Sequence, residues 1–422
     1  MALLLTREDE HRLSGDDGPA VELAMRVLVK LAKAMGAENL LDITGAHVDS
    51  CLFHGRATLD FAERLIRDGA QVVVPTTLNV SSLDLLHPEL YRGDAENGQL
   101  ARRLMDAYVS MGCSPTWTCA PYQLEKRPGF GEHVAWAESN AIVFANSVLG
   151  ARTDRYGDFV DICAAITGRV PAAGLHLSTN RWATVAIRLV DIGSKLLESS
   201  VLAPVLGALV GSSIGSRVPV LEGFREPPNE DWLKAFGAAA ASTGGVGMFH
   251  VVGATPEAPS FEAAVGGGSL DGELEVGIED LRRVRDLLTT ASGGDLGTIS
   301  LGTPHYSVGE FERLLGVLDG RTIHPDIDFF VSTGRGIFSE LEDRGWAEQL
   351  QSAGVTIVTD TCTYVTPILR DRTGVVMTDS AKWAYYAPGN LGVEVVFASL
   401  TECAESAIAG FVSFDDTLWD CS

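Results

Sequence analysis

The order of apolar and polar positions along the chain predicts helices that alternate with short buried strands. In residues 19–35 the apolar side chains recur at helical spacing, and Pro19 and Gly36 stand where helices commonly begin and end. A short apolar run (NLLDITGAHV), a helix-like segment (ATLDFAERLIRDG) and a strand-like segment (AQVVVPTT) follow in turn. Because this alternation is typical of parallel strands covered by helices, we expect an α/β fold with several layers.

Glycine-rich segments interrupt this alternation in the middle of the chain. LGALVGSSIGSRVP, ASTGGVGMFHVVG and AVGGGSLDG all fall between residues 200 and 275. Helix-like and strand-like segments then resume near residue 279, with EDLRRVRDLLTT, DLGTISLGTPH, DFFVST and VTIVTDTC. The pattern therefore predicts a first α/β region over residues 1–200, a glycine-rich region over 201–275 and a second α/β region over 276–422.

Composition narrows the class of protein and of partner. The chain has 422 residues, and its 32 Lys and Arg against 56 Asp and Glu give a net charge of −24. This acidic balance argues against nucleic-acid and anionic-membrane partners, because no basic excess offsets phosphate charge. The N-terminal MALLLTREDEHRL lacks the apolar core of a secretory signal, and the longest apolar run, near 202–211, is too short to cross a bilayer. We expect a cytoplasmic protein.

Several familiar motifs are missing from the sequence. It contains no Gly-Lys dipeptide of a Walker A loop, no CxxC pair and no HExxH. Gly211 to Gly215 fits the G-x-S-x-G pattern of serine hydrolases, but the following SRVPVLEG does not read as the helix that this motif requires. We interpret the segment as a glycine-rich turn that packs closely on its neighbour.

The placement of the cysteines points toward a metal centre. Cys119 follows the strand-like TWT, and Cys362 closes the buried strand VTIVTDTC. Ligands of α/β sheets gather at the carboxyl ends of strands, so these two thiols are candidate metal ligands. Cys51, flanked by His47 and His54, is a third candidate. A cysteine taken singly is more often a small buried apolar residue.

Polar side chains also collect in three segments that look like the wall of a site. LGTPHYS places His305 directly after a strand, and TDSAKWAYYAPGNLG brings Lys382 together with two tyrosines. WAESNAIVFANSVLGARTDRYGD, residues 136–158, mixes amides and hydroxyls with apolar residues. Buried donors and acceptors need partners, so this segment is either a structural polar network or part of a site.

The longest of these motifs identifies a family. WAESNAIVFANSVLGARTDRYGDFVDICAAITGRVP resembles the signature of the aconitase X family, and so do VVVPTTLNVSSLD, TCAPYQLEKRPGFGEH, GLHL, FHVVGATPEAPS, LGTPHYS, TDTC and SAKWAYYAPG. The resemblance runs from about residue 3 to residue 400. It implies an aconitase-like dehydratase with three α/β domains around an iron–sulfur cluster.

The resemblance also implies a set of site residues. Cys119 and Cys362 match the cysteine-bearing motifs of the family. Where some relatives have a third cysteine this chain has Thr303, so either Cys51 takes that place or the cluster is smaller. Further candidates hold the substrate or take part in catalysis: Ser82, Tyr122, Asn140, Asn146, Arg152, His305 and Lys382.

The family includes two kinds of dehydratase, and we favour the one that acts on cis-3-hydroxy-L-proline. A phosphorylated substrate such as mevalonate 5-phosphate needs several cations, whereas the site loops offer few beyond Arg152 and Lys382. The alternative stays open if Lys126, Arg127 and Arg155 converge in space. An iron-responsive RNA-binding protein is a non-enzymatic alternative that the negative charge disfavours.

The resemblance predicts a partner as well. Aconitase-like enzymes close a swivelling domain over the site, and the sequence after the last site-like loop leaves no room for one. We therefore expect a large subunit that works as a heterodimer with a small swivelling subunit, which carries the serine base.

Overall fold

The computed structural model of the chain describes residues 3–370, 374–415 and 417–420, so the extreme ends of the predicted first and last regions lie outside it. Its strands form four sheets. Every pair of named strands is parallel except β1 with β5. The predicted α/β fold with several layers is confirmed.

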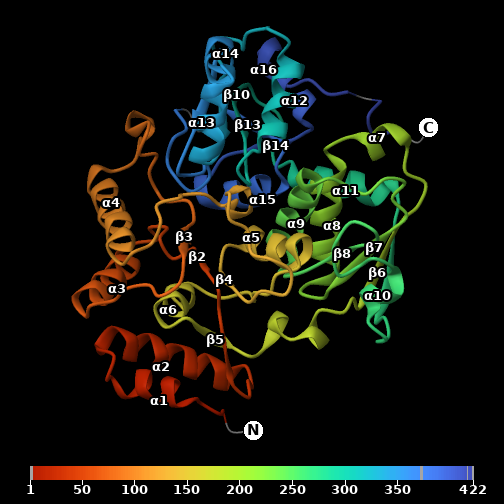
Figure 1. Cartoon of the computed structure of the whole chain (residues 1–422). Helices are drawn as coiled ribbons and strands as arrows, with labels where there is room; N and C mark the ends of the chain where they lie inside the picture. Colours follow the sequence, from red (N-terminus) through yellow and green to blue (C-terminus); the bar gives the residue numbers. More distant parts are fainter. Residues whose placement is uncertain (1–2, 371–373, 416, 421–422) are drawn as a thin grey trace.

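The first region occupies the left and lower parts of Figure 1, around the three-stranded sheet β3-β2-β4. Helix α2 (Pro19–Ala34) confirms the helix predicted over residues 19–35 and packs against α6. The remaining elements are α1 (Arg7–Ser14), β1 (Leu40–Asp42), β2 (Ala46–Val48), α3 (Arg56–Arg67), β3 (Thr76–Leu78), η1 (Pro88–Leu90), α4 (Ala95–Ser110), η2 (Pro121–Gln123), β4 (Ala135–Trp136), α5 (Ser139–Phe144), η3 (Ala145–Leu149), α6 (Val160–Thr167), β5 (Arg169–Pro171), η4 (Gly174–His176) and η5 (Ser178–Asn180).

The second region lies on the right of Figure 1 and contains the four-stranded sheet β8-β7-β6-β9. Strand β6 comes before the boundary expected at residue 200 and pairs with both β7 and β9. The elements are β6 (Val185–Leu189), α7 (Ser194–Glu198), α8 (Leu202–Ile214), β7 (Pro219–Glu222), α9 (Glu230–Gly244), β8 (His250–Val251), α10 (Phe261–Val265) and β9 (Gly272–Val276).

Glycines let helices α8 and α9 approach until their backbones touch. A Cβ on Gly207 would lie 2.3 Å from the Phe236 carbonyl oxygen, and one on Gly244 would lie 1.8 Å from the Gly211 carbonyl oxygen. Close packing was expected at residues 211–215, but the predicted turn was wrong. The segment forms the end of helix α8, because its glycines pack against a second helix instead of reversing the chain.

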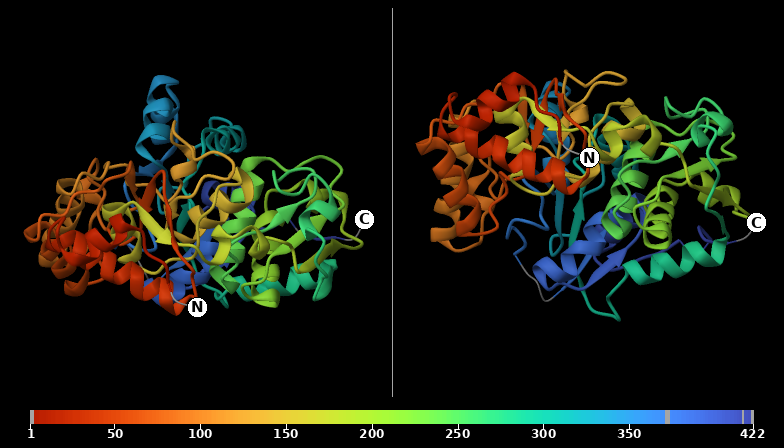
Figure 2. Two further views of the ribbon diagram at one scale, coloured as in Figure 1. Left: turned by 60° about the horizontal axis from the view of Figure 1, so that its bottom comes forward. Right: turned by 90° about the horizontal axis from the view of Figure 1, so that it is seen from below.

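The third region lies at the top of Figure 1 and contains the five-stranded sheet β12-β11-β10-β13-β14. Figure 2 shows the first and second regions on opposite sides of the molecule in both of its views. Helix α11 (Ile278–Leu288) links the second and third regions and packs against α8 on the right of Figure 1. The elements of the third region are β10 (Leu296–Leu301), α12 (Val308–Leu318), β11 (Asp328–Ser332), α13 (Arg335–Asp343), α14 (Trp346–Ala353), β12 (Val355–Val358), β13 (Val375–Thr378), α15 (Ala381–Leu391), β14 (Val395–Phe397) and α16 (Leu400–Ala409).

The three regions meet around helices α5 and α15, near the centre of Figure 1. Both helices contact α9 of the second region. The loops that follow the strands of the three-stranded and five-stranded sheets enter this junction. Because ligands of parallel sheets bind beyond the carboxyl ends of strands, the junction is where a site is expected.

Candidate active site

Three buried side chains form a potential metal-binding group at this junction. The ligand atoms of Cys119, His305 and Cys362 all lie within 4.8 Å of one another. His305 follows β10, Cys362 follows β12, and the His305 backbone N–H donates to the Cys119 sulfur at 3.3 Å. The structure therefore brings together two of the cysteines expected as ligands and the histidine expected as a catalytic residue.

The group fits an iron centre. Thiolates and imidazole are suitable iron ligands, and the three ligand atoms are close enough together to serve one centre. The Cys119 thiol and burial raise the pKa of Cys362 well above its ordinary value, although Lys382 and Thr303 lower it. The buried Thr303 hydroxyl has no hydrogen-bond partner among the described residues. The Thr303 hydroxyl beside the Cys362 thiol is therefore available to a bound group.

His305 is held at both ring nitrogens. Nδ1 lies 3.0 Å from the Thr118 hydroxyl, and Nε2 lies 3.2 Å from the Thr361 carbonyl oxygen. Burial lowers the pKa of His305 to about 4, so the ring is neutral at physiological pH. A neutral imidazole can bind a metal, but here it must first give up one of these two contacts.

A buried ion pair lies beside the metal group. Lys382, at the start of α15, donates to Glu138, the residue that caps α5. Burial alone would raise the pKa of Glu138, but the Lys382 charge and hydrogen bonds from Ala141 and Asn140 lower it. Burial opposes the charge of Lys382, yet Glu138 raises its pKa well above the ordinary value. Both groups are therefore charged.

Asn140 connects this ion pair to the metal group. Its Nδ2 donates to the Cys119 carbonyl oxygen at 2.6 Å and to Glu138 at 3.0 Å, while its Oδ1 accepts from Tyr122 at 2.8 Å. The Tyr122 ring stacks on Phe144, with 3.7 Å between centroids. Asn140 and Tyr122, both predicted from the sequence, thus belong to one hydrogen-bonded network that connects Glu138 to the Cys119 backbone.

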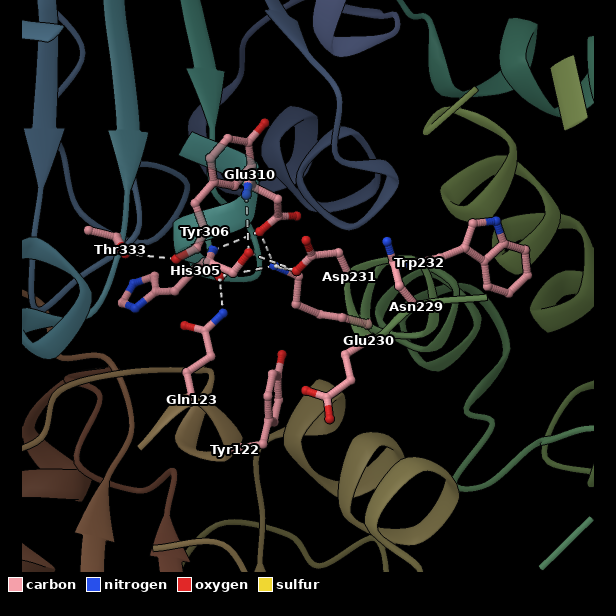
Figure 3. Close-up of polar contacts among 12 residues, drawn as sticks. Tyr122, Gln123, Asn229, Glu230, Asp231, Trp232, His305, Tyr306, Glu310 and Thr333 are labelled. Carbon is pink, nitrogen blue, oxygen red and sulfur yellow. Dashed lines mark hydrogen bonds and ion pairs between the residues drawn. The ribbon is translucent and has the colours of Figure 1, made fainter. Parts of the chain in front are cut away.

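A second polar network holds the backbone of the His305 loop (Figure 3). Gln123 Nε2 donates to the His305 carbonyl at 3.1 Å, and Lys234 Nζ of helix α9 donates to the same oxygen at 3.2 Å. Lys234 also pairs with Glu310, which accepts from the N–H of Ser307, the N-cap of helix α12. A cavity of about 710 Å³ reaches this network and has Thr303, Lys234 and Lys382 in its lining.

Sequence reasoning missed Lys234 and Glu310, and it did not assign Glu138 a role. Lys234 stands in the ordinary helical pattern EDWLKAF, so nothing local indicates that its side chain is buried. Glu138 lies two residues after the end of strand β4 and directly before helix α5. Its place at a strand end was the signal that could have identified it.

Four of the predicted site residues form their hydrogen bonds with groups other than the three metal ligands. Arg152 donates to the His176 carbonyl and the Ser178 hydroxyl, and Asn146 bonds Thr153, Gly247 and Arg181. Ser82 accepts from the Phe53 N–H. The Cys51 thiol faces the carbonyls of Val48, Asn79 and Val80. No contact among the described residues joins any of these four to the metal ligands.

None of the helices described is both long and apolar enough to cross a membrane. Comparison with known families matches three successive domain models: the aconitase X first domain over residues 2–179, the second domain over 183–286 and the third domain over 296–409.

Characterised relatives match nearly the whole chain. The cis-3-hydroxy-L-proline dehydratase of Pseudomonas aeruginosa is 43% identical over 405 residues, covering 95% of this chain and 69% of the relative. The enzyme of the same name from Hypocrea jecorina is 40% identical, covering 97% and 70%. The phosphomevalonate dehydratase large subunit of Methanothermobacter thermautotrophicus is 37% identical, covering 93% and 96%.

A solved structure is similar as well. The holo-form crystal structure of Thermococcus kodakaraensis aconitase X superposes with a TM-score of 0.86 at 32% identity, covering 96% of this chain and all of that one. Fold, sequence and the order of the domains therefore agree.

Proposed function

The chain belongs to the aconitase X family, and we propose that it removes water from cis-3-hydroxy-L-proline to form Δ1-pyrroline-2-carboxylate. Its relatives make it a hydro-lyase, which favours the enzyme over the RNA-binding alternative. The observation that carries the substrate is the identity of 43% and 40% to two cis-3-hydroxy-L-proline dehydratases, against 37% to the phosphomevalonate relative.

The charges near the site support the same choice. A phosphorylated substrate needs several unpaired cations, but Lys382 is already paired with Glu138 and Lys234 with Glu310. Two of the three cations that left the alternative open are engaged elsewhere. Arg127 pairs with Glu230, and Arg155 donates to the carbonyls of Ala241 and Val246.

Cys119, His305 and Cys362 are the residues that would hold the iron centre expected from the family. When bound, such a centre supplies a Lewis acid toward the leaving hydroxyl. The rest of the chemistry falls to side chains of this chain. Lys382, fixed by Glu138, presents a cation to the substrate carboxylate and stabilises the negative charge that develops there as the α-proton leaves. Asn140 keeps the ion pair in place against the Cys119 backbone.

The proton transfer requires a base on the opposite side of the substrate. In cis-3-hydroxy-L-proline the α-hydrogen and the 3-hydroxyl lie on opposite faces of the ring, so an anti elimination needs groups on both sides. We propose that a small swivelling subunit carries this base and closes the site against water. The near-complete coverage of a relative named as a large subunit supports a heterodimer.

The test is to purify the chain without oxygen, alone and with a co-expressed small subunit, and to offer both compounds. We expect iron in the protein, pyrroline formation from cis-3-hydroxy-L-proline, and activity only in the heterodimer. Turnover of mevalonate 5-phosphate alone would overturn the substrate, and full activity of the isolated chain would overturn the need for a partner.

A further inference from the structure

Three polar side chains form a row across the carboxyl edge of the three-stranded sheet. In the register of the sheet, His47 of β2 lies opposite Thr77 of β3 and Trp136 of β4. Extended by two residues, just past the strand ends, this register places Asp49 between Asn79 and Glu138, and the Asn79 N–H still bonds the Val48 carbonyl. Neighbouring strands are about 4.8 Å apart, so the row is compact.

Asp49 is the acid in this row that has no cation. Asn79 Nδ2 donates to its Oδ1, and no residue in the described ranges donates to its Oδ2. Glu138, by contrast, binds Lys382, and the nearby Asp161 accepts from the Ser50 hydroxyl and three backbone N–H groups. The side chain of Asp49 is only partly buried, so this second oxygen is open to a ligand.

Two further buried polar atoms on the same face have no hydrogen-bond partner among the described residues. Asn79 is 2% exposed, and its Oδ1 forms no hydrogen bond with any described residue. His47 Nε2 is likewise buried and unpaired in the described part of the chain. Buried polar atoms left in this way are costly unless something binds them. The open Asp49 oxygen and the Asn79 amide oxygen are adjacent acceptors.

We propose that Asp49 and Asn79 bind the ring ammonium of the cyclic amino acid substrate and so select a zwitterionic over a purely anionic hydroxy acid. A secondary ammonium has two N–H donors, which matches the two acceptors. The carboxylate of the same substrate is then directed toward Lys382, on the other side of Glu138. The inference rests on the proposed function, because only an amino acid substrate carries this cation.

The electrostatic environment of Asp49 agrees with a cationic ligand. Burial and the charge of Glu138 raise its pKa to about 7, against the lowering effect of Asn79. A bound ammonium would relieve this like-charge repulsion and favour the ionised carboxylate. An anionic substrate without nitrogen would instead add a third negative group to the row. The row thus discriminates by charge as well as by hydrogen bonding.

The test compares two unreactive probes on the iron-loaded heterodimer by calorimetry. L-proline has the ring ammonium, and cyclopentanecarboxylate has the same ring size and carboxylate without nitrogen. We expect wild type to prefer L-proline, and Asp49→Asn to weaken L-proline binding by about 10- to 100-fold while leaving cyclopentanecarboxylate unchanged. Asp49→Glu should restore part of the preference, and Asp158→Asn, at an exposed nearby acid, should change neither affinity.

The outcomes separate this inference from the function it rests on. If wild type dehydrates cis-3-hydroxy-L-proline but Asp49→Asn keeps the full preference for L-proline, the inference is wrong and the function stands. If Asp49→Asn does not fold, Asn79→Ser removes the second acceptor and must weaken L-proline selectively. Turnover of mevalonate 5-phosphate alone, without L-proline binding, overturns both.

Discussion

The two sheets that meet at the site present edges of very different chemistry. The edge of the three-stranded sheet carries Asn79, Asp49 and Glu138, which are hydrogen-bonding and anionic groups. The edge of the five-stranded sheet carries Cys362, His305 and the hydroxyl of Thr303, which are neutral and suited to a metal. On our proposals, one edge would recognise the charge of the substrate and the other would hold the iron centre. The Glu138–Lys382 ion pair joins them.

The largest effect is expected from removing a thiol at the metal edge. Cys119→Ser or Cys362→Ser should lose iron and reduce kcat by roughly 10³-fold or more, since the Lewis acid is worth several kcal/mol. Iron content and turnover measure this. Cys163→Ser, in the core of the first region, is the matched control and should keep both. Full iron in either of the first two variants would contradict the assignment.

Breaking the ion pair between the edges should cost folding stability. Lys382→Met leaves Glu138 buried and charged without a partner, which typically costs about 3–5 kcal/mol. Urea unfolding of the metal-free chain measures the free energy of unfolding. The double variant Lys382→Met with Glu138→Gln should recover most of the loss, because the uncompensated charge is gone. If the double variant is no more stable than Lys382→Met, the uncompensated charge of Glu138 is not the cause of the lost stability.

The pH dependence of stability should distinguish the two acids of the charged edge. Because the pKa of Asp49 is raised to about 7 from an ordinary 3.8, the folded state keeps a proton that the unfolded chain has already released. The stability of the metal-free chain therefore falls as pH rises from about 4 to about 7, by roughly 1–2 kcal/mol for a partly exposed group. Asp49→Asn should reduce the fall by that amount, and the remainder comes from Glu310, Asp379 and Asp161, because burial raises the pKa of each of these acids as well.

Glu138 is the internal comparison, because its pKa is lowered in the folded protein. Its contribution is present at neutral pH and is lost as pH falls through its folded pKa. The free energy of unfolding of Glu138→Gln should therefore be lower than that of wild type at neutral pH. The difference should shrink as the pH falls. Urea midpoints at several pH values measure both trends, and a fall as steep in Asp49→Asn as in wild type would show that Asp49 does not contribute to it.

The smallest effect is expected behind the metal edge. Lys234→Met removes a donor to the His305 carbonyl and should lower kcat by about 10-fold, as loss of a residue that orients a metal ligand often does. Lys195→Met is the matched control, because Lys195 pairs with Asp415 at an exposed part of the same cavity. Equal effects of the two variants would mean that Lys234 does not position the loop. Steady-state kinetics with the iron content fixed provide the measurement.

Sequence reasoning predicted the parts of this site that depend on local pattern. Cys119, Cys362 and His305 follow strand-like runs, so strand ends and motif resemblance located them together. The partnership of Asp49 with Asn79 depends on how β2 pairs with β3, which no local pattern encodes. The burial of Lys234 depends on the packing of α9 against the third region. Such tertiary contacts can be seen only in the folded chain.

The segment over residues 136–158 illustrates the same limit. Its two asparagines were expected to serve one site, yet Asn140 contacts Cys119 while Asn146 bonds Arg181 and Gly247 of the second region. Both of the alternatives considered for this segment therefore apply, each to one part of it. The residues near Asn140 line the site, and those near Asn146 form a structural polar network.

The division falls at η3 (Ala145–Leu149), a π-helical turn that directly continues α5. A π turn holds about one residue more than an α turn. Such a turn therefore acts like one extra residue inserted into an α-helix. The insertion changes the angular phase of everything that follows it, by about 100° for one residue. Ser147 can therefore accept from the Phe249 N–H while Asn140, on the same continuous helix, donates to the Cys119 carbonyl. Wound instead as a regular α-helix, the same residues would place Ser147, seven positions after Asn140, within about 20° of the same face and direct both side chains toward one neighbour.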